Sequence, residues 1–174
     1  DHRDLYYPLR RQRQMCISDS VSEAYIAHLL SYVDLKALKP LKIVCTAGNG
    51  GAGPVVDLLE PHLPFEFIKL HHEADGHFPN GVPNPMIEEN RVASANLVRE
   101  TGADMGIAWD GDFDRCFFYD HTGVFIEGYY VVGLLAASFL AKSSQETVVH
   151  DPRLTWNTMD LSLIHISEPT RRRG

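Results

Sequence analysis

Residues 103–119 read ADMGIAWDGDFDRCFFY. The first seven are mostly apolar and predict a buried strand, and the stretch from Cys116 to Tyr119 predicts a second strand. Between the two strands, Asp110, Asp112 and Asp114 occupy alternating positions of a loop. Because side chains at alternating positions of an extended chain point the same way, we expect the three carboxylates to share one side of the loop.

Three like charges on one side of a loop repel one another unless a positive group lies among them. Mg²⁺ meets this need, because it prefers hard oxygen ligands and accepts an incomplete set of carboxylates when phosphate and water complete its octahedron. Arg115, which is planar and permanently charged, is suited to bind a phosphate beside such a metal. The loop therefore predicts a magnesium site next to a phosphate site.

Two other interpretations of the acidic loop compete with this one. A plain turn rich in Asp and Gly is common, but it does not require three aligned carboxylates followed by an arginine. A calcium loop of the EF-hand type does not fit the spacing. Arg115 stands where that loop needs its glycine, and His121 stands where it needs its bidentate glutamate.

The composition narrows the class of protein. A chain of 174 residues with 44% hydrophobic residues can form one domain with a real core, and its net charge of −7 argues against a general nucleic-acid binder. Three cysteines without a C-x-x-C pair favour a reducing, cytoplasmic setting. The longest apolar run, residues 129–141, is too short to span a bilayer. We therefore expect no nucleic-acid or membrane partner.

Predicted strands and helices alternate along the chain, which indicates an α/β fold: an open mixed sheet with helices packed on it. Ligands of such sheets collect outside the carboxyl ends of the strands. Besides the two strands above, the patterns predict strands at 41–45, 65–70, 124–126 and 147–151, and helices near 18–34, 54–59, 89–101 and 129–142.

A glycine-rich loop, GNGGAG at residues 48–53, follows the predicted strand 41–45. It matches G-x-G-x-x-G, so a nucleotide-binding module is an alternative function. The acidic residue that would bind the ribose is poorly placed, because Glu73 is the only candidate after the next strand. The interpretation we prefer is a tight strand–helix turn that needs glycine for steric reasons.

The long loop at residues 71–85 carries His71, His72 and His77 together with two acidic residues. Loops of this length are usually functional or mobile. A zinc site is conceivable, but the spacing of these side chains matches no standard ligand set. We interpret the histidines as surface or hydrogen-bonded residues.

Six motifs occur in order along the chain: GNGGAG (48–53), DGHFPNGVPNP (75–85), GADMGIA (102–108), DGDFDR (110–115), FIEGYY (125–130) and HDPRLTWNT (150–158). Together they resemble the α-D-phosphohexomutase family over roughly residues 18 to 160. Phe113 between the second and third aspartates, with Cys116 after Arg115, resembles the phosphomannomutase branch of that family.

The resemblance implies one part of a four-domain architecture. Residues 18–149 would form the second domain and residues 150–160 the start of the third. Residues 1–17 would be a linker or the end of a missing first domain, which agrees with a chain that begins at Asp1 rather than Met. Residues 161–174 leave the family pattern and look like translated adapter or vector sequence, so we expect a non-native tail.

The resemblance also implies roles for individual residues. Asp110, Asp112 and Asp114 would hold Mg²⁺, with a phosphoserine of the missing first domain as the fourth protein ligand. Arg115 would lie against that phosphoryl group, and Arg153 would lie near the substrate. The implied reaction interconverts mannose 6-phosphate and mannose 1-phosphate through the phosphoserine and a bisphosphate intermediate.

The expected partners are therefore a phosphosugar and the missing domains of the same polypeptide. The family's serine loop, T-A-S-H-N-P, is absent from this chain. We expect no mutase turnover from the isolated chain, and a catalytically dead remnant stays open as an interpretation.

Overall fold

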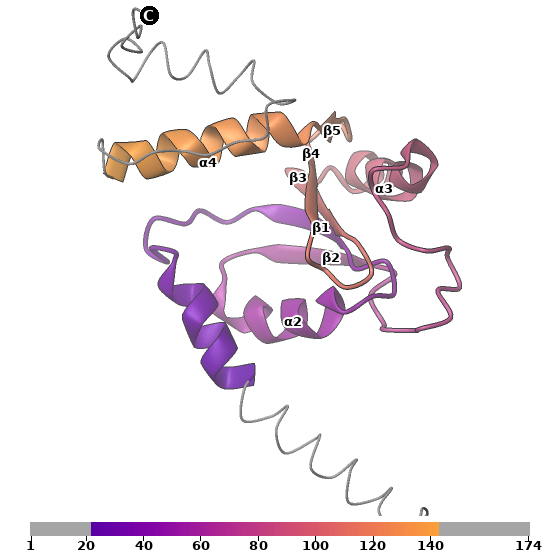
Figure 1. Cartoon of the computed structure of the whole chain (residues 1–174), viewed down its shortest axis with the longest axis horizontal. Coiled ribbons are helices and arrows are strands. Elements are labelled where there is room, and N and C mark those ends of the chain that lie inside the picture. Colours follow the sequence, from indigo (N-terminus) through magenta and orange to yellow (C-terminus); the bar gives the residue numbers. More distant parts are fainter. Residues whose placement is uncertain (1–21, 143–174) are drawn as a thin grey trace, which may run out of the picture.

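The computed structural model describes residues 22–142, which form a five-stranded mixed sheet with helices packed on it (Figure 1). The strands are β1 (Lys42–Thr46), β2 (Glu66–Leu70), β3 (Met105–Trp109), β4 (Cys116–Tyr119) and β5 (Phe125–Ile126). The helices are α2 (Ala52–Leu59), α3 (Val92–Thr101) and α4 (Gly128–Lys142), with short 3-10 turns η1 (Glu60–His62) and η2 (Glu88–Arg91), and a further helix covers residues 22–31.

The strand order is β2-β1-β3-β4-β5. β1 pairs in parallel with both β2 and β3, whereas β4 pairs antiparallel with β3 and with β5. Because β1, β2 and β3 run the same way, the loops that follow them meet at one edge of the sheet. The predicted open mixed α/β fold is confirmed, and the acidic loop lies at that edge.

Helices cover both faces of the sheet. On one face, Val44 of β1 packs with Val98 of α3 and Tyr119 of β4, and none of these three side chains reaches solvent. On the other face, Ile43 and Cys45 of β1 pack with Val56 of α2. Consecutive residues of β1 thus serve opposite layers, because side chains alternate along a strand. β1 is therefore buried on both of its faces.

The helix predicted at residues 89–101 is divided in two. Residues 88–91 form η2, and the regular α3 starts only at Val92. The side chain of Arg91 donates to the carbonyls of Pro85 (2.7 Å) and Met86 (3.0 Å), which ties the start of the helix to the preceding loop. At the other end, Gly102 adopts a φ of 60° and its amide donates to the carbonyls of Val98 and Arg99, so α3 ends as predicted.

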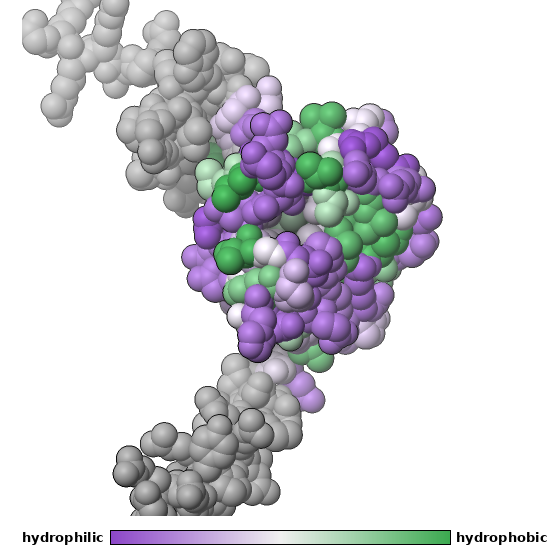
Figure 2. Space-filling model, turned by 90° about the vertical axis from the view of Figure 1, so that its right-hand side faces the viewer, coloured by the Kyte–Doolittle hydropathy of each residue, from purple (hydrophilic) through white to green (hydrophobic). Residues whose placement is uncertain are grey.

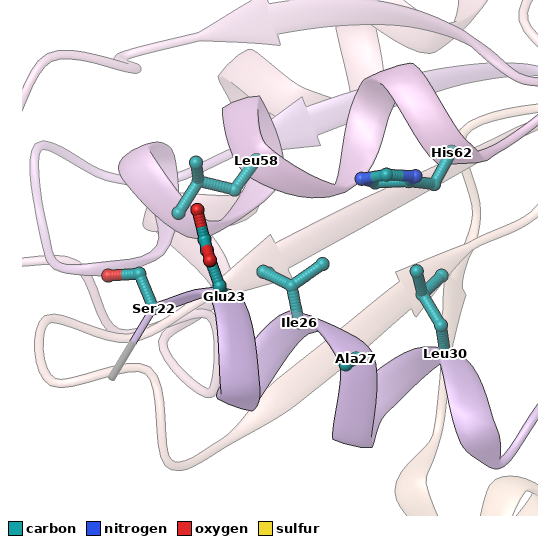
Figure 3. A pocket seen from close by; sticks show the side chains of 7 residues that line it. All are labelled: Ser22, Glu23, Ile26, Ala27, Leu30, Leu58 and His62. Carbon is teal, nitrogen blue, oxygen red and sulfur yellow. The ribbon is translucent and has the colours of Figure 1, made fainter. Parts of the chain in front are cut away.

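The helix at residues 22–31 buries Ile26 and borders a cavity of about 580 Å³ together with Leu58 and His62 (Figure 3). α2 leads away from the edge of the acidic loop, so this cavity lies apart from that loop. No helix within residues 22–142 has both the length and the apolar character to cross a membrane.

Apolar side chains also remain on the surface. On the side of the molecule at the right of Figure 1, hydrophobic areas interrupt a largely hydrophilic surface (Figure 2). Exposed apolar residues include Met86 and Ile87 of the loop before η2 and Leu134 and Phe139 of α4. Some of the expectations from the sequence lie outside the described residues. These are the strand at 147–151, the segments 1–17, 150–160 and 161–174, and Arg153.

Candidate metal centre

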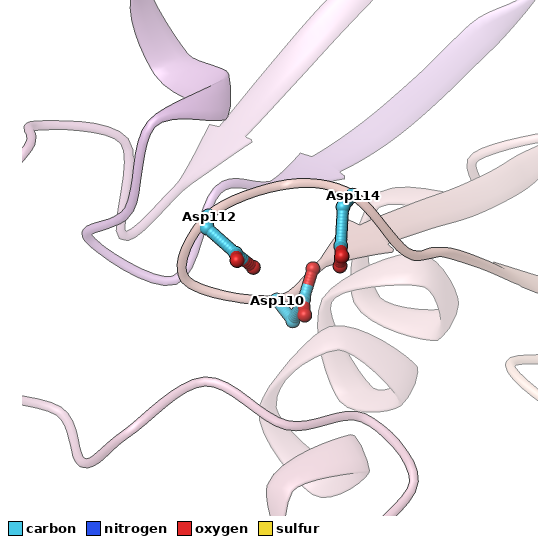
Figure 4. A group of neighbouring side chains, drawn as sticks. All are labelled: Asp110, Asp112 and Asp114. Atoms are coloured by element: carbon cyan, nitrogen blue, oxygen red, sulfur yellow. The ribbon is translucent and has the colours of Figure 1, made fainter.

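The three aspartates of the acidic loop point toward a common position (Figure 4). One carboxylate oxygen from each of Asp110, Asp112 and Asp114 lies within 4.8 Å of the others. Asp110 is buried, with 1% of its surface exposed, whereas Asp112 and Asp114 are exposed. The predicted convergence of the carboxylates is confirmed.

The backbone reason for this convergence differs from the prediction. The loop is a turn rather than an extended segment, because the amide of Phe113 donates to the carbonyl of Asp110 (3.2 Å) and Phe113 has a φ of 49°. The amide of Arg115 then donates to Oδ1 of Asp110 (3.1 Å). The chain therefore wraps around the Asp110 side chain, and the inference from alternating positions was wrong about the local geometry.

Arg115 neutralises part of the acidic charge. Its Nη2 forms an ion pair with Oδ2 of Asp110, and its Nε lies 3.4 Å from Oδ1 of Asp114. Burial alone raises the pKa of Asp110, but the amide and the guanidinium of Arg115 outweigh it and hold that pKa below its ordinary value. The Arg115 side chain is 51% exposed, so one face of the guanidinium remains open to solvent.

This donor set fits magnesium. All three ligand groups are hard carboxylate oxygens, and the buried one is held in place by the backbone. The two exposed carboxylates face solvent, which leaves room for water and a phosphate to complete an octahedron. Within residues 22–142, no other group of three metal-ligating side chains converges in this way.

The histidines of the long loop do not converge. Nε2 of His72 lies 2.8 Å from Oδ1 of Asp57, and Nδ1 of His77 lies 2.9 Å from Oδ1 of Asp75. His72 and His77 thus each have a carboxylate partner of their own. The interpretation of these two residues as hydrogen-bonded is confirmed, and no group of three metal-ligating side chains within residues 22–142 includes a histidine.

Backbone amides of the glycine loop donate hydrogen bonds to carbonyl oxygens within the protein. The amide of Asn49 donates to the carbonyl of His71 (2.7 Å), the amide of Gly50 to that of Ala47 (2.9 Å) and the amide of Gly51 to that of Gly111 (3.0 Å). A nucleotide phosphate needs free amides in such a loop. These three are already used, so the structure favours the steric interpretation of the loop over the nucleotide-binding one.

A small crevice of about 130 Å³ lies at the same edge of the sheet and was not anticipated from the sequence. Thr46, Ser94 and Trp109 are among its lining residues, and the hydroxyls of Thr46 and Ser94 are 2.8 Å apart. Ser94 is 1% exposed and engaged in this hydrogen bond. The crevice has no local sequence signal, because the residues that line it come from distant parts of the chain and meet only where α3 packs against β1.

Comparison with known proteins gives consistent results. Residues 23–123 match the family model described as phosphoglucomutase/phosphomannomutase, alpha/beta/alpha domain II. The chain is 70% identical over 138 residues to a protein of Xanthomonas campestris pv. campestris named phosphohexose mutases, a match that covers 79% of this chain and 31% of that protein. It is 54% identical over 147 residues to a phosphomannomutase of Vibrio cholerae, covering 82% and 32%.

A solved structure of a phosphoglucomutase/phosphomannomutase family protein from Burkholderia thailandensis is similar in fold. The TM-score is 0.65 at 34% sequence identity, and the match covers 70% of this chain and 26% of that one. The chain thus spans about a third of the length of the curated relatives that it matches.

Proposed function

Because the chain belongs to the phosphoglucomutase/phosphomannomutase family, we propose that it supplies the metal-binding domain of a phosphomannomutase. The observation that carries the proposal is the convergence of Asp110, Asp112 and Asp114 within 4.8 Å at the carboxyl edge of the parallel strands. The phosphomannomutase names of several relatives support mannose phosphates as substrates.

The proposed reaction interconverts mannose 6-phosphate and mannose 1-phosphate through a phosphoserine and a bisphosphate intermediate. The serine belongs to another domain of the same polypeptide, so this chain alone supplies part of the site. Bound Mg²⁺ would spread the negative charge that develops on the migrating phosphoryl group. We assign residues 18–149 to the second domain, 150–160 to the start of the third, 1–17 to a linker or the end of the first domain, and 161–174 to a non-native tail.

Each side chain of the loop has a distinct part in this proposal. Asp110 forms the fixed floor of the metal site, because it is buried and held by Arg115. Asp112 and Asp114 close the site from the solvent side. Arg115 would bind the phosphoryl group through the exposed face of its guanidinium, where parallel N–H donors suit phosphate oxygens. Arg153 would contact the substrate from the next domain.

The metal site can be tested on the chain itself. Titration with Mn²⁺, followed by the EPR signal of the free ion, should show one site that Mg²⁺ competes for. Asp112→Asn should weaken binding by at least about tenfold, since it removes one anionic ligand. Glu100→Gln is the matched control, because Glu100 is an exposed carboxylate at the end of α3, which precedes β3, whereas the acidic loop follows β3. Equal binding by all three proteins would refute the proposal.

The reaction itself requires the complete polypeptide. There, Asp112→Asn should lower kcat for the conversion of mannose 6-phosphate, whereas Glu100→Gln should leave it unchanged. The pure 174-residue chain should show no conversion because it lacks the serine loop. Measurable turnover by the pure chain would overturn this part of the proposal. A cytoplasmic location is proposed on the cysteine content alone.

A further inference from the structure

The glycine loop and the acidic loop are in backbone contact. A Cβ atom added to Gly50 would lie 2.5 Å from the carbonyl oxygen of Gly111 and 2.9 Å from its Cα. The amide of Gly51 donates to the same carbonyl oxygen at 3.0 Å. Because the atoms that meet Gly50 belong to the backbone, a side chain there would force one of the two loops to move.

Phe113 extends this contact. A Cβ atom added to Gly51 would lie 2.7 Å and 2.8 Å from two ring atoms of Phe113, so the ring rests directly on the glycine backbone. Phe113 itself has a φ of 49°, a conformation that favours glycine. The ring contact with Gly51 helps to hold the acidic loop in this unusual backbone geometry.

Asn49 joins the glycine loop to the long loop that follows β2. The Nδ2 of Asn49 donates to the carbonyl of Glu73 (2.8 Å), and the Oδ1 of Asn49 accepts from Nδ2 of Asn80 (2.8 Å). Its own carbonyl accepts from the amide of Asp75 (2.9 Å). Asn49 is 9% exposed and has a φ of 59°, so it joins the glycine loop firmly to the long loop after β2.

The three aspartates differ in what holds them. Asp110 is held by Arg115, and Asp114 lies beside the Nε of Arg115. The Asp112 carboxylate makes no hydrogen bond or ion pair within residues 22–142. Its place is therefore set only by the backbone of residues 111–113, which is the segment that the glycine loop contacts.

We propose that Asn49, Gly50 and Gly51 are positioning residues that set the location of the Asp112 carboxylate in the metal site. This inference rests on the proposed metal-binding function and assigns a role to the glycine loop that involves no ligand of its own. The loop acts as a rigid support: Asn49 fixes it, Gly50 permits the close approach, and Gly51 receives the Phe113 ring.

The first test compares two glycine variants for Mn²⁺ affinity and for urea midpoint without metal. Gly50→Ala should lower Mn²⁺ affinity about tenfold, the scale seen when a residue that orients a metal ligand is lost. Gly76→Ala is the matched control, because a Cβ atom there would meet nothing within 4 Å. A Gly50→Ala protein that is folded and binds Mn²⁺ as tightly as wild type would overturn the inference.

The second test uses the wild-type chain, so it does not depend on whether a variant folds. Amide hydrogen exchange is measured with and without Mg²⁺ at two glycines. The amide of Gly51 donates a hydrogen bond to the carbonyl of Gly111 in the acidic loop, and the amide of Gly123 donates one to the carbonyl of Asp120 in the β4–β5 hairpin. Saturating Mg²⁺ should slow exchange at Gly51 several-fold and leave Gly123 unchanged. If Mg²⁺ binds but does not slow amide exchange at Gly51, the inference is overturned. If the wild-type chain binds neither Mn²⁺ nor Mg²⁺, the proposed function is refuted instead.

Discussion

Asp112→Asn should change the stability of the chain in opposite directions with and without metal. The three carboxylates lie within 4.8 Å of one another, and at that separation each like-charged pair repels by about 0.9 kcal/mol in a water-like dielectric. Removing the charge of Asp112 relieves two such pairs, and it forfeits the weaker, longer-range attraction of Asp112 to positive groups such as Arg115. The net gain in the free energy of unfolding should be about 0.5–1 kcal/mol in the absence of metal.

With metal the order should reverse. A ligand at a hundred times its Kd stabilises the folded state by about 2.7 kcal/mol, and the wild-type chain should gain this amount from Mg²⁺. The amide that replaces the Asp112 carboxylate in the variant is neutral, so a variant that binds tenfold more weakly should gain only about 1.4 kcal/mol at the same concentration. The variant should therefore be the more stable protein in chelator and the less stable one in Mg²⁺.

Urea unfolding followed by circular dichroism measures both states. With an m value of about 2 kcal/mol per molar urea, the chelator midpoint should rise by roughly 0.25–0.5 M in the variant. Glu100→Gln should follow the wild type in both buffers, since Glu100 lies at the other end of β3 from the acidic loop. A variant that is less stable than wild type in chelator, or that gains as much from Mg²⁺, would show that the carboxylates do not share one cation site.

Three further outcomes follow from the same structure. The Arg115 contacts lower the pKa of Asp110 in the folded state. The stabilisation from these contacts is therefore present above the unfolded pKa of about 3.9 and is lost as the pH falls through the folded pKa. Urea midpoints measured between pH 7 and 2.5 should fall more steeply for wild type than for Asp110→Asn. Gly106→Ala should cost about 1–3 kcal/mol by overpacking, because the new Cβ would lie 2.8 Å from Cγ2 of Val98; an unchanged thermal midpoint would contradict this. Gly102→Ala should cost only about 1 kcal/mol, since the φ of 60° is strained for alanine but a Cβ atom there meets nothing within 4 Å; a loss larger than that of Gly106→Ala in the same thermal scan would refute the reasoning.

The elements that sequence reasoning found are those with a local signal. Within residues 22–142, apolar runs located the strands to within two residues, and helical periodicity placed the end of α3 correctly near Thr101. The start of α3 at Val92 was missed because it depends on Arg91 binding the carbonyls of an earlier loop, a contact without a sequence pattern. Propensity and periodicity describe neighbours along the chain, and they say little about such loop contacts.

The convergence of the three carboxylates was predicted from the sequence, but the backbone turn that produces it was not. Three aspartates and an arginine at close spacing were enough to propose a cation site. The turn that brings them together depends on Phe113 at positive φ, a conformation that sequence alone does not assign to phenylalanine. The role of Asn49 was equally hidden, since its side-chain partners Glu73 and Asn80 lie 24 and 31 residues away.

The ion pair between Asp110 and Arg115 has a consequence for how the site fills. The guanidinium of Arg115 neutralises part of the charge on Asp110 without any bound cation. Under the proposed function, Mg²⁺ would share the Asp110 carboxylate with Arg115, whose exposed part would stay open to an anion. Binding of the cation and binding of the phosphate would then favour each other.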